Sequence, residues 1–208
     1  AIRFSMIIAI PSAVGLAVLA APISNLLFPG RDNTDLIKMT CYGSSAVVVY
    51  SLSTVTNAVL QGINRMKTPI RNAGISLVLH TVILFVMLRY LHMGIYGVLY
   101  ANILFALFIC ILNARAIARF KRYRQEVKKT FLIPMVASAV MGAAAFGVYR
   151  AAYSVFGNLI STGISVLVAV AVYFVLLILL KGVDTQELRS MPGGTRLSGL
   201  ARKLHLMR

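Results

Sequence analysis

Six long apolar stretches follow one another along this sequence and limit what it can fold into. They cover about residues 6–28, 36–60, 70–91, 95–112, 131–153 and 159–180. A helix needs about 20 apolar residues to cross the roughly 30 Å hydrocarbon core of a bilayer. The stretches show no sustained alternation of the kind that marks membrane strands. Because helices satisfy their own backbone hydrogen bonds in lipid, we predict an all-α membrane protein with six transmembrane helices.

Composition excludes several other classes of protein. Hydrophobic residues make up 59% of the 208 residues and charged residues only 12%, against about 25% charged residues in soluble domains. The chain is too apolar to be disordered. It is also too apolar for a soluble nucleic-acid-binding domain, so we expect no nucleic-acid partner despite the net charge of +16. Cys41 and Cys110 both lie in apolar stretches and suggest neither a disulfide framework nor a metal site.

The basic residues predict the topology. If the connections are assigned alternately to two sides, 17 of the 21 Lys and Arg residues fall on the side that holds both chain ends. Cytoplasmic loops carry the Lys and Arg excess in membrane proteins. We therefore expect a multi-pass protein of the plasma membrane with both ends of this segment in the cytoplasm. The opposite side holds only Arg31, Lys38, Arg89 and Arg150.

Charge and loop composition divide the chain into four regions. We expect residues 1–116 to form a partial lobe of four membrane helices and residues 117–130 a basic cytoplasmic loop. Residues 131–181 would form a final pair of membrane helices, and residues 182–208 a basic cytoplasmic tail. The chain begins with Ala1, and its first residues resemble a loop that enters a helix, not a signal peptide. We therefore expect a fragment of a longer membrane protein; the alternative is a trimmed but complete six-helix protein.

The second apolar stretch carries the most polar side chains. Tyr50, Thr54, Asn57 and Gln61 recur at helical spacing, so they share one helix face. This stripe either lines a substrate cavity or forms hydrogen bonds between helices. His80 in the third stretch is a second candidate for a cavity-lining residue, because ionisable residues are costly in membranes; the alternative is a packing role.

Asn102 in the fourth stretch completes the candidate cavity-lining set.

The first stretch contains Pro11, Gly15 and Pro22. Proline kinks a membrane helix by leaving a carbonyl without its donor. These three residues therefore predict either a bending helix that gates a cavity or a static kink.

The fifth stretch carries a face of small residues, Ala139, Ala143 and Gly147. Small residues four apart allow close approach of a second helix, so we expect helix packing here; a groove for a lipid tail is the alternative.

A basic segment follows the fourth stretch. Its cations could bind anionic lipid head groups or could simply mark a cytoplasmic loop. The candidate lipid contacts are Arg115, Arg119, Arg122, Lys128 and Lys129.

The acidic residues argue against ion coupling and catalysis within this segment. All five acids, Asp32, Asp35, Glu126, Asp184 and Glu187, lie outside the six stretches. The sequence contains no Ser-His-Asp set, no HExxH motif and no phosphate-binding loop. We therefore expect no enzyme activity, no catalytic residue, no metal and no cofactor.

Three sequence motifs resemble a known family. They are IPSAVGL at residues 10–16 with API at 21–23 and LLF at 26–28, LQGINRMKTP at 60–69, and GIYGV at 94–98. Together they resemble the polysaccharide-biosynthesis and flippase branch of the multidrug/oligosaccharidyl-lipid/polysaccharide exporter superfamily. That branch includes flippases of peptidoglycan precursors and proteins of spore cortex formation.

The resemblance implies both architecture and function. It implies that the six helices correspond to helices nine to fourteen of a fourteen-helix, two-lobed transporter, whose N-terminal helices would be the partner of this segment. The implied substrate is a lipid-linked oligosaccharide, resembling lipid II, that is moved by alternating access among membrane lipids. Residues 132–153 and 159–180 would then line a groove for the lipid tail. The alternatives are a multidrug exporter of the same superfamily and a non-transporting scaffold protein of wall synthesis.

Overall fold

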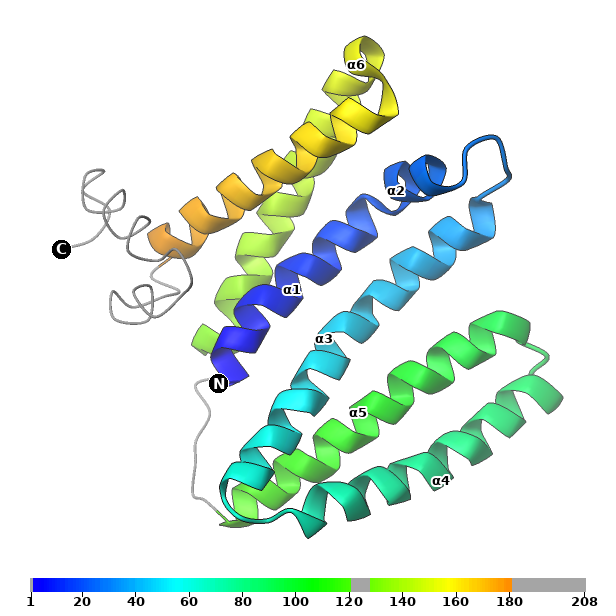
Figure 1. Cartoon of the computed structure of the whole chain (residues 1–208), viewed down its shortest axis with the longest axis vertical. Helices are drawn as coiled ribbons and strands as arrows, with labels where there is room; N and C mark the ends of the chain where they lie inside the picture. Colours follow the sequence, from blue (N-terminus) through cyan, green and yellow to red (C-terminus); the bar gives the residue numbers. More distant parts are fainter. Residues whose placement is uncertain (1, 121–127, 181–208) are drawn as a thin grey trace.

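The computed structural model describes residues 2–120 and 128–180, and all regular structure in these residues is helical (Figure 1). Four helical segments are long and apolar enough to cross a membrane, or five if the bent pair α1 and α2 counts as one span. The helices are thus those of an all-α protein and are compatible with a multi-pass membrane protein. They are α1 (Ile2–Val18), α2 (Ala20–Leu27), α3 (Thr34–Gly62), α4 (Lys67–Arg89), α5 (Gly94–Phe120), the π-helix η1 (Lys128–Leu132) and α6 (Ile133–Leu179).

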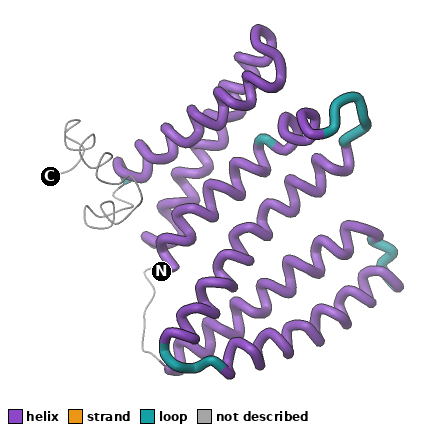
Figure 2. The backbone as a smooth tube through the Cα atoms, in the orientation of Figure 1, coloured by secondary structure: helices purple, strands orange, loops and turns teal. Residues whose placement is uncertain are grey.

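The long helices lie side by side in an order that differs from their order in the chain. α1 packs between α3 and α6, and α5 packs between α3 and α4 (Figure 1). Short turns join α3 to α4 and α4 to α5 (Figure 2). Asn64, His92 and Gly94 take positive φ values of 58°, 50° and 55° in these turns. Gly adopts that conformation readily and Asn more readily than most residues, which helps the chain reverse within a few residues.

The first apolar stretch is bent, and the expected single span is two helices. α1 and α2 meet at Leu19 with an angle of 68° between them. Pro22 has no N–H with which to reach the carbonyl of Val18, and its ring crowds that turn. A proline on the C-terminal side of the break is a usual cause of a sharp kink. The bend therefore lies three residues before Pro22, whereas α1 runs through Pro11 as one helix.

α6 is a hairpin of two arms. Gly157 has φ 72° and ψ −178°, outside the helical range, and divides the helix into residues 133–156 and 158–179. Figure 1 shows that the two arms run antiparallel, and the members of one buried cluster recur every four residues on each arm. They are Ala137, Met141 and Ala145 on the first arm and Ala169, Tyr173 and Leu177 on the second.

The small residues expected to pack the first arm lie in a different register. Ala139, Ala143 and Gly147 are exposed on the described chain, so no described helix packs on that face. The close contact is made instead by Gly142, where an added Cβ would lie 2.9 Å from Cγ1 of Val14 in α1. The arm presents several faces with small residues, and the position of α1 selects one of them.

α5 is longer than the apolar stretch that predicted it. The basic loop expected from residue 117 begins later, because α5 continues to Phe120. Asn113 is fully buried in α5, where its side chain forms hydrogen bonds to other helices. The Arg residues that follow are good helix formers, so the helix continues beyond its apolar part. The predicted tail, residues 182–208, lies outside the described residues.

Candidate functional site

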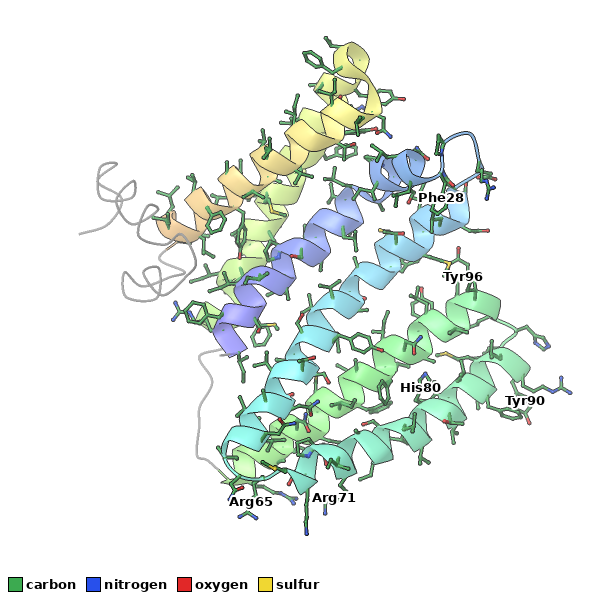
Figure 3. All side chains as sticks on the ribbon, viewed as in Figure 1. Phe28, Arg65, Arg71, His80, Tyr90 and Tyr96 are labelled. Atoms are coloured by element: carbon green, nitrogen blue, oxygen red, sulfur yellow. The ribbon has the colours of Figure 1, made fainter. Side chains whose placement is uncertain are left out.

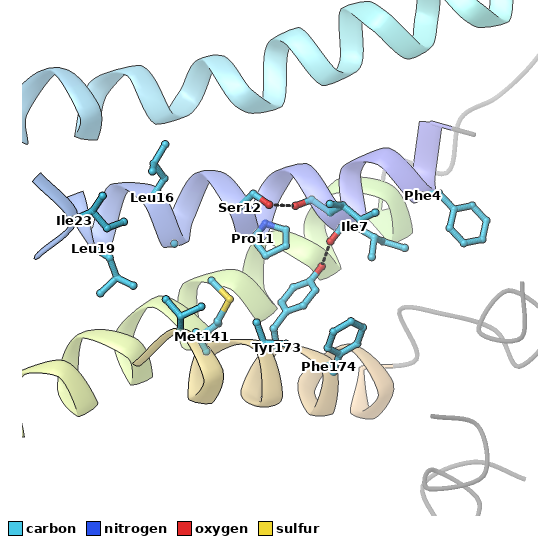
Figure 4. A pocket seen from close by; sticks show the side chains of 15 residues that line it. Phe4, Ile7, Pro11, Ser12, Leu16, Leu19, Ile23, Met141, Tyr173 and Phe174 are labelled. Carbon is cyan, nitrogen blue, oxygen red and sulfur yellow. Dashed lines mark hydrogen bonds between the residues drawn. The ribbon is translucent and has the colours of Figure 1, made fainter. Parts of the chain in front are cut away.

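A groove of about 710 Å³ opens between α1 and the second arm of α6 (Figure 4). Pro11, Gly15 and Leu16 contribute to the α1 wall, and Val170 and Phe174 to the α6 wall. The groove therefore joins the beginning of the chain to its last apolar stretch, because α1 packs directly on α6.

The groove wall is hydrocarbon almost throughout. Ser12 and Tyr173 are its only polar side chains among the described residues that line it. The Ser12 hydroxyl donates to the Ile8 carbonyl at 2.7 Å, and the Tyr173 hydroxyl donates to the Ile7 carbonyl at 2.6 Å (Figure 4). Because both donors are occupied within the protein, the wall suits an apolar chain and offers little to a sugar or a phosphate.

One hydrogen bond across the groove follows directly from a proline. In an α-helix the carbonyl of residue 7 accepts from the N–H of residue 11, but Pro11 has none. The Ile7 carbonyl is therefore free for another donor, and Tyr173, buried on the opposite wall, provides it. Pro11 thus leaves the Ile7 carbonyl free to accept the hydrogen bond that joins α6 to α1.

Leu19 and Ile23 line one end of the groove, and a second contact joins the two walls beyond that end. The side-chain amide of Asn158, next to the Gly157 reversal, donates to the Pro22 carbonyl at 3.0 Å. Its oxygen accepts a hydrogen bond of 2.9 Å from the Tyr149 hydroxyl. The second arm of α6 is therefore held at two separate points, to α1 and to α2.

The groove is open along its side. Ile8 on one wall is 64% exposed, and Val166 and Val170 on the other are 43% and 49% exposed. Apolar side chains that stay exposed in a protein of this composition are suited to contact with lipid chains. A flexible apolar ligand can therefore enter the groove laterally without threading through the fold.

The groove agrees in part with the predicted one. Val166, Ala169, Val170 and Tyr173 come from the sixth apolar stretch, as expected, but the fifth stretch contributes only Met141. The other wall is α1, which was expected to gate a cavity. Pro11 and Gly15 line the groove itself, and Pro22 lies beyond its end.

The predicted polar stripe lies on α3, away from the groove. Tyr50, Thr54 and Gln61 are exposed on the described chain, and Asn57 is half-buried. The Tyr50 hydroxyl approaches the backbone carbonyl of Asn102 at 3.4 Å, which brings two of the predicted residues together. The Thr54 hydroxyl bonds to the carbonyl of Tyr50 one turn earlier, so it is satisfied within its own helix.

A buried amide cluster, which the sequence did not single out, joins α3, α4 and α5. Asn72 of α4 donates to Asn113 of α5 at 2.9 Å, and both side chains are buried. Asn113 in turn donates to Thr56 at 3.1 Å and to Asn57 at 2.7 Å, both on α3. Of these residues only Asn57 was predicted as a site residue. Asn72 lies near the start of the third apolar stretch and Asn113 directly after the fourth, so only their mutual contact distinguishes them from residues at a helix end.

His80 lies on the seam between α4 and α5 (Figure 3). Its ring packs against that of Phe105, with 5.4 Å between the centroids, and its buried Nε2 atom has no hydrogen-bond partner among the described residues. Asn102 is exposed on α5. None of the six predicted cavity-lining residues lies on the groove.

The predicted lipid contacts are only partly described. Arg115 and Arg119 are exposed near the end of α5, where head groups could reach them. Arg122 lies outside the described residues, and so do the side chains of Lys128 and Lys129.

Comparisons of the chain with protein-family models, with curated proteins and with solved structures gave no match. The family resemblance of residues 10–28, 60–69 and 94–98 therefore stays a prediction. The geometry of the groove is the observation on which a function can be based.

Proposed function

We propose that this chain belongs to a membrane transporter that moves a lipid-linked saccharide precursor, resembling lipid II, across the plasma membrane by alternating access. In this proposal the groove between α1 and α6 holds the polyprenyl tail. The saccharide and phosphate are handled elsewhere, because the groove has no free polar donor to bind them. The motifs that resemble the flippase branch support the choice of substrate.

The observation that carries the proposal is the apolar, laterally open groove. Its volume of about 710 Å³ lies within the usual range of ligand pockets, about 300–1,000 Å³. A lipid tail is already out of water in a bilayer, so van der Waals contact with the groove wall would hold it. A long unbranched or isoprenoid chain can thus bind through contact area alone, without any polar anchor.

The proposed membrane arrangement has six spans. The bent pair α1 and α2 would be one, α3, α4 and α5 three more, and the two arms of α6 the last two. With both ends cytoplasmic, the Gly157 reversal and the turn at residues 91–93 would face the outside. Residues Arg65 and Lys67, between α3 and α4, would then face the cytoplasm.

The binding test uses the whole chain and a diazirine-labelled polyprenyl phosphate in dodecyl maltoside micelles. Val170→Trp fills the groove from an exposed position and should reduce crosslinking several-fold. Val175→Trp is the matched control, since Val175 is 47% exposed on the same arm but does not line the groove. Crosslinking that survives Val170→Trp, or that maps by mass spectrometry to α3–α5, would contradict the proposed tail site.

A transport test separates the three functions that the sequence leaves open. The chain would be reconstituted in liposomes together with the helices expected to precede it, and flipping of a fluorescent lipid II analogue would be measured. A flippase moves the analogue, whereas a multidrug exporter moves an amphipathic dye in its place. A scaffold moves neither and instead co-purifies with proteins of wall synthesis; either of these two outcomes rejects the proposed function.

A further inference from the structure

A cluster of one carboxylate and three tyrosines lies between the first turns of α3 and the first turns of α5. Asp35 is in the first turn of α3 and is exposed. The hydroxyl of Tyr96, near the start of α5, donates to Oδ1 of Asp35 at 3.0 Å. Figure 3 shows Tyr96 at this end of α5, facing α3. This hydrogen bond joins two helices that are adjacent in the fold but 61 residues apart in sequence.

Two further aromatic rings lie beside this pair. Tyr42, two turns along α3, and Tyr100, one turn along α5, have ring centroids 6.4 Å apart and planes tilted by 41°. Tyr96 and Tyr100 are one turn apart on the same face of α5, so the Tyr42–Tyr100 ring pair lies next to the Asp35–Tyr96 hydrogen bond. Tyr42 is 50% exposed, so the cluster is open to a ligand from outside the bundle.

The chemistry of this cluster suits an organic cation. The face of an aromatic ring is electron-rich and attracts an ammonium group within about 6 Å of the centroid, which is how choline-type ligands are recognised. A carboxylate adds a full opposite charge. Calcium would need six or more oxygen ligands, which one carboxylate and three phenols do not supply.

Asp35 is the one charge in the cluster, and Lys38 lies one turn after it on α3. Asp32 and Asp35 are the only acidic side chains in residues 2–120 and 128–180. The nearby cation Lys38 interacts with Asp32, whose pKa it helps to lower. The described residues place no cation in an ion pair with Asp35, and its single hydrogen bond from Tyr96 leaves Oδ2 available.

We propose that Asp35, Tyr42, Tyr96 and Tyr100 form a binding site for a small organic ammonium ion, of quaternary or alkylated type. The cation lies against the Tyr42 and Tyr100 rings and is neutralised by Asp35, which Tyr96 holds in position. The site is separate from the groove, which is lined by α1 and α6. Its existence does not depend on the proposed transport of lipid-linked saccharides.

Choline is the probe, and 3,3-dimethyl-1-butanol is its uncharged control of nearly the same shape. The full chain would be labelled with 3-fluorotyrosine and held in dodecyl maltoside micelles, which contain no ammonium group. Replacement of each tyrosine in turn by Phe assigns its ¹⁹F resonance. Titration with choline should shift the resonances of Tyr42, Tyr96 and Tyr100, whereas the alcohol should not. Tyr90, 71% exposed at the end of α4, reports non-specific effects.

Two substitutions test the assigned roles. Asp35→Asn keeps an acceptor for Tyr96 but removes the charge, and should weaken choline binding about fivefold or more. Tyr42→Leu removes a ring and should weaken binding about two- to fivefold, whereas Tyr42→Phe should retain it. Asp32→Asn is the matched control and should leave binding within twofold, because Asp32 bonds to Thr34 and not to the cluster.

The alternative is that these tyrosines only mark the membrane interface, where tyrosine is common. In that case choline and the alcohol would shift the resonances equally, or neither would. Equal loss of binding in Asp32→Asn and Asp35→Asn would also overturn the proposal, since it would reduce the site to a general negative surface.

Discussion

The half of the molecule formed by α3, α4 and α5 and the half formed by α1 and α6 are held together differently. In the first half, side chains bond to side chains, and Asn113 links three helices. In the second half, apolar side chains pack together along α1 and α6, and the hydrogen bond between these two helices runs from Tyr173 to a backbone carbonyl. The donors of the amide cluster in the polar half bond to other side chains of that half. The apolar half contains the groove.

In the proposed membrane setting, this difference would let the protein keep an apolar groove and still fix its walls. Hydrophobic attraction between helices is weak in lipid, so packing and hydrogen bonds must hold them. A free polar side chain in the groove would exclude a hydrocarbon ligand. The acceptor left by Pro11 solves this, because it is part of the backbone and is covered by Tyr173. Four predictions test the contrast, from the largest expected effect to the smallest.

Close packing should dominate the apolar half. Gly142→Leu places a large side chain where even a Cβ would lie 2.9 Å from Val14, and should destabilise the fold by about 3 kcal/mol. Gly147→Leu is the control, because nothing lies within 4 Å of a Cβ at that exposed position. The free energy of unfolding would be measured by steric trapping in micelles. Equal effects at both positions would mean that α1 does not pack on this face of α6.

The amide cluster should be the strongest point of the polar half. Asn113→Leu removes three hydrogen bonds, at about 0.6 kcal/mol each in a membrane, and should cost about 2 kcal/mol of stability. Asn102→Leu, on the exposed side of the same helix, should change stability by less than about 0.5 kcal/mol. If Asn113→Leu proves as mild as Asn102→Leu, the cluster does not hold the three helices.

The bond across the groove can be tested by a double-mutant cycle. Tyr173→Phe should cost about 1 kcal/mol, because it leaves the Ile7 carbonyl without a donor. In a Pro11→Ala background the same change should cost clearly less, since the new N–H at position 11 can reach that carbonyl. Additive effects in the unfolding free energies of the two single variants and the double variant would contradict the role assigned to Pro11.

The connection between the halves should show the smallest effect, a shift in one pKa. The Thr34 hydroxyl donates to Asp32 at 2.7 Å and, with the Thr34 N–H, lowers the pKa of that carboxyl. A carboxyl whose pKa is lowered by folding stabilises the fold at pH values above its ordinary pKa. This stabilisation is lost as the pH falls through the lowered pKa. Thr34→Val should raise the pKa of Asp32 in a ¹³C titration, whereas Thr34→Ser should keep it low.

Much of the fold was predictable because a membrane restricts the choice. Long apolar stretches predict helices, and those at residues 36–60, 70–91 and 95–112 correspond to α3, α4 and α5 with shifted ends. The ends shifted because buried Asn and exposed Arg residues continue a helix beyond its apolar part, as at Asn113 and Arg115. The bend at Leu19 and the register of Gly142 depend on neighbours that the local sequence does not specify.

The candidate site was predictable only in part. The sixth apolar stretch was expected to line a groove, and Pro11 was identified as a special position. Tyr173 was not, because a single tyrosine in an apolar stretch gives no periodic signal. The polar stripe of Tyr50, Thr54 and Gln61 was a real feature of α3, but it lies on another part of the molecule.

The sequence by itself determined that this chain is helical and suited to a membrane, since length and apolarity leave the backbone few ways to satisfy its hydrogen bonds in lipid. It also determined where backbone carbonyls lose their donors, because that follows from the positions of Pro11 and Pro22. Only the tertiary structure decided which side chains meet those carbonyls and where the groove opens. Those features depend on contacts between helices that are far apart in sequence, and many faces of an apolar helix look alike until a neighbour selects one.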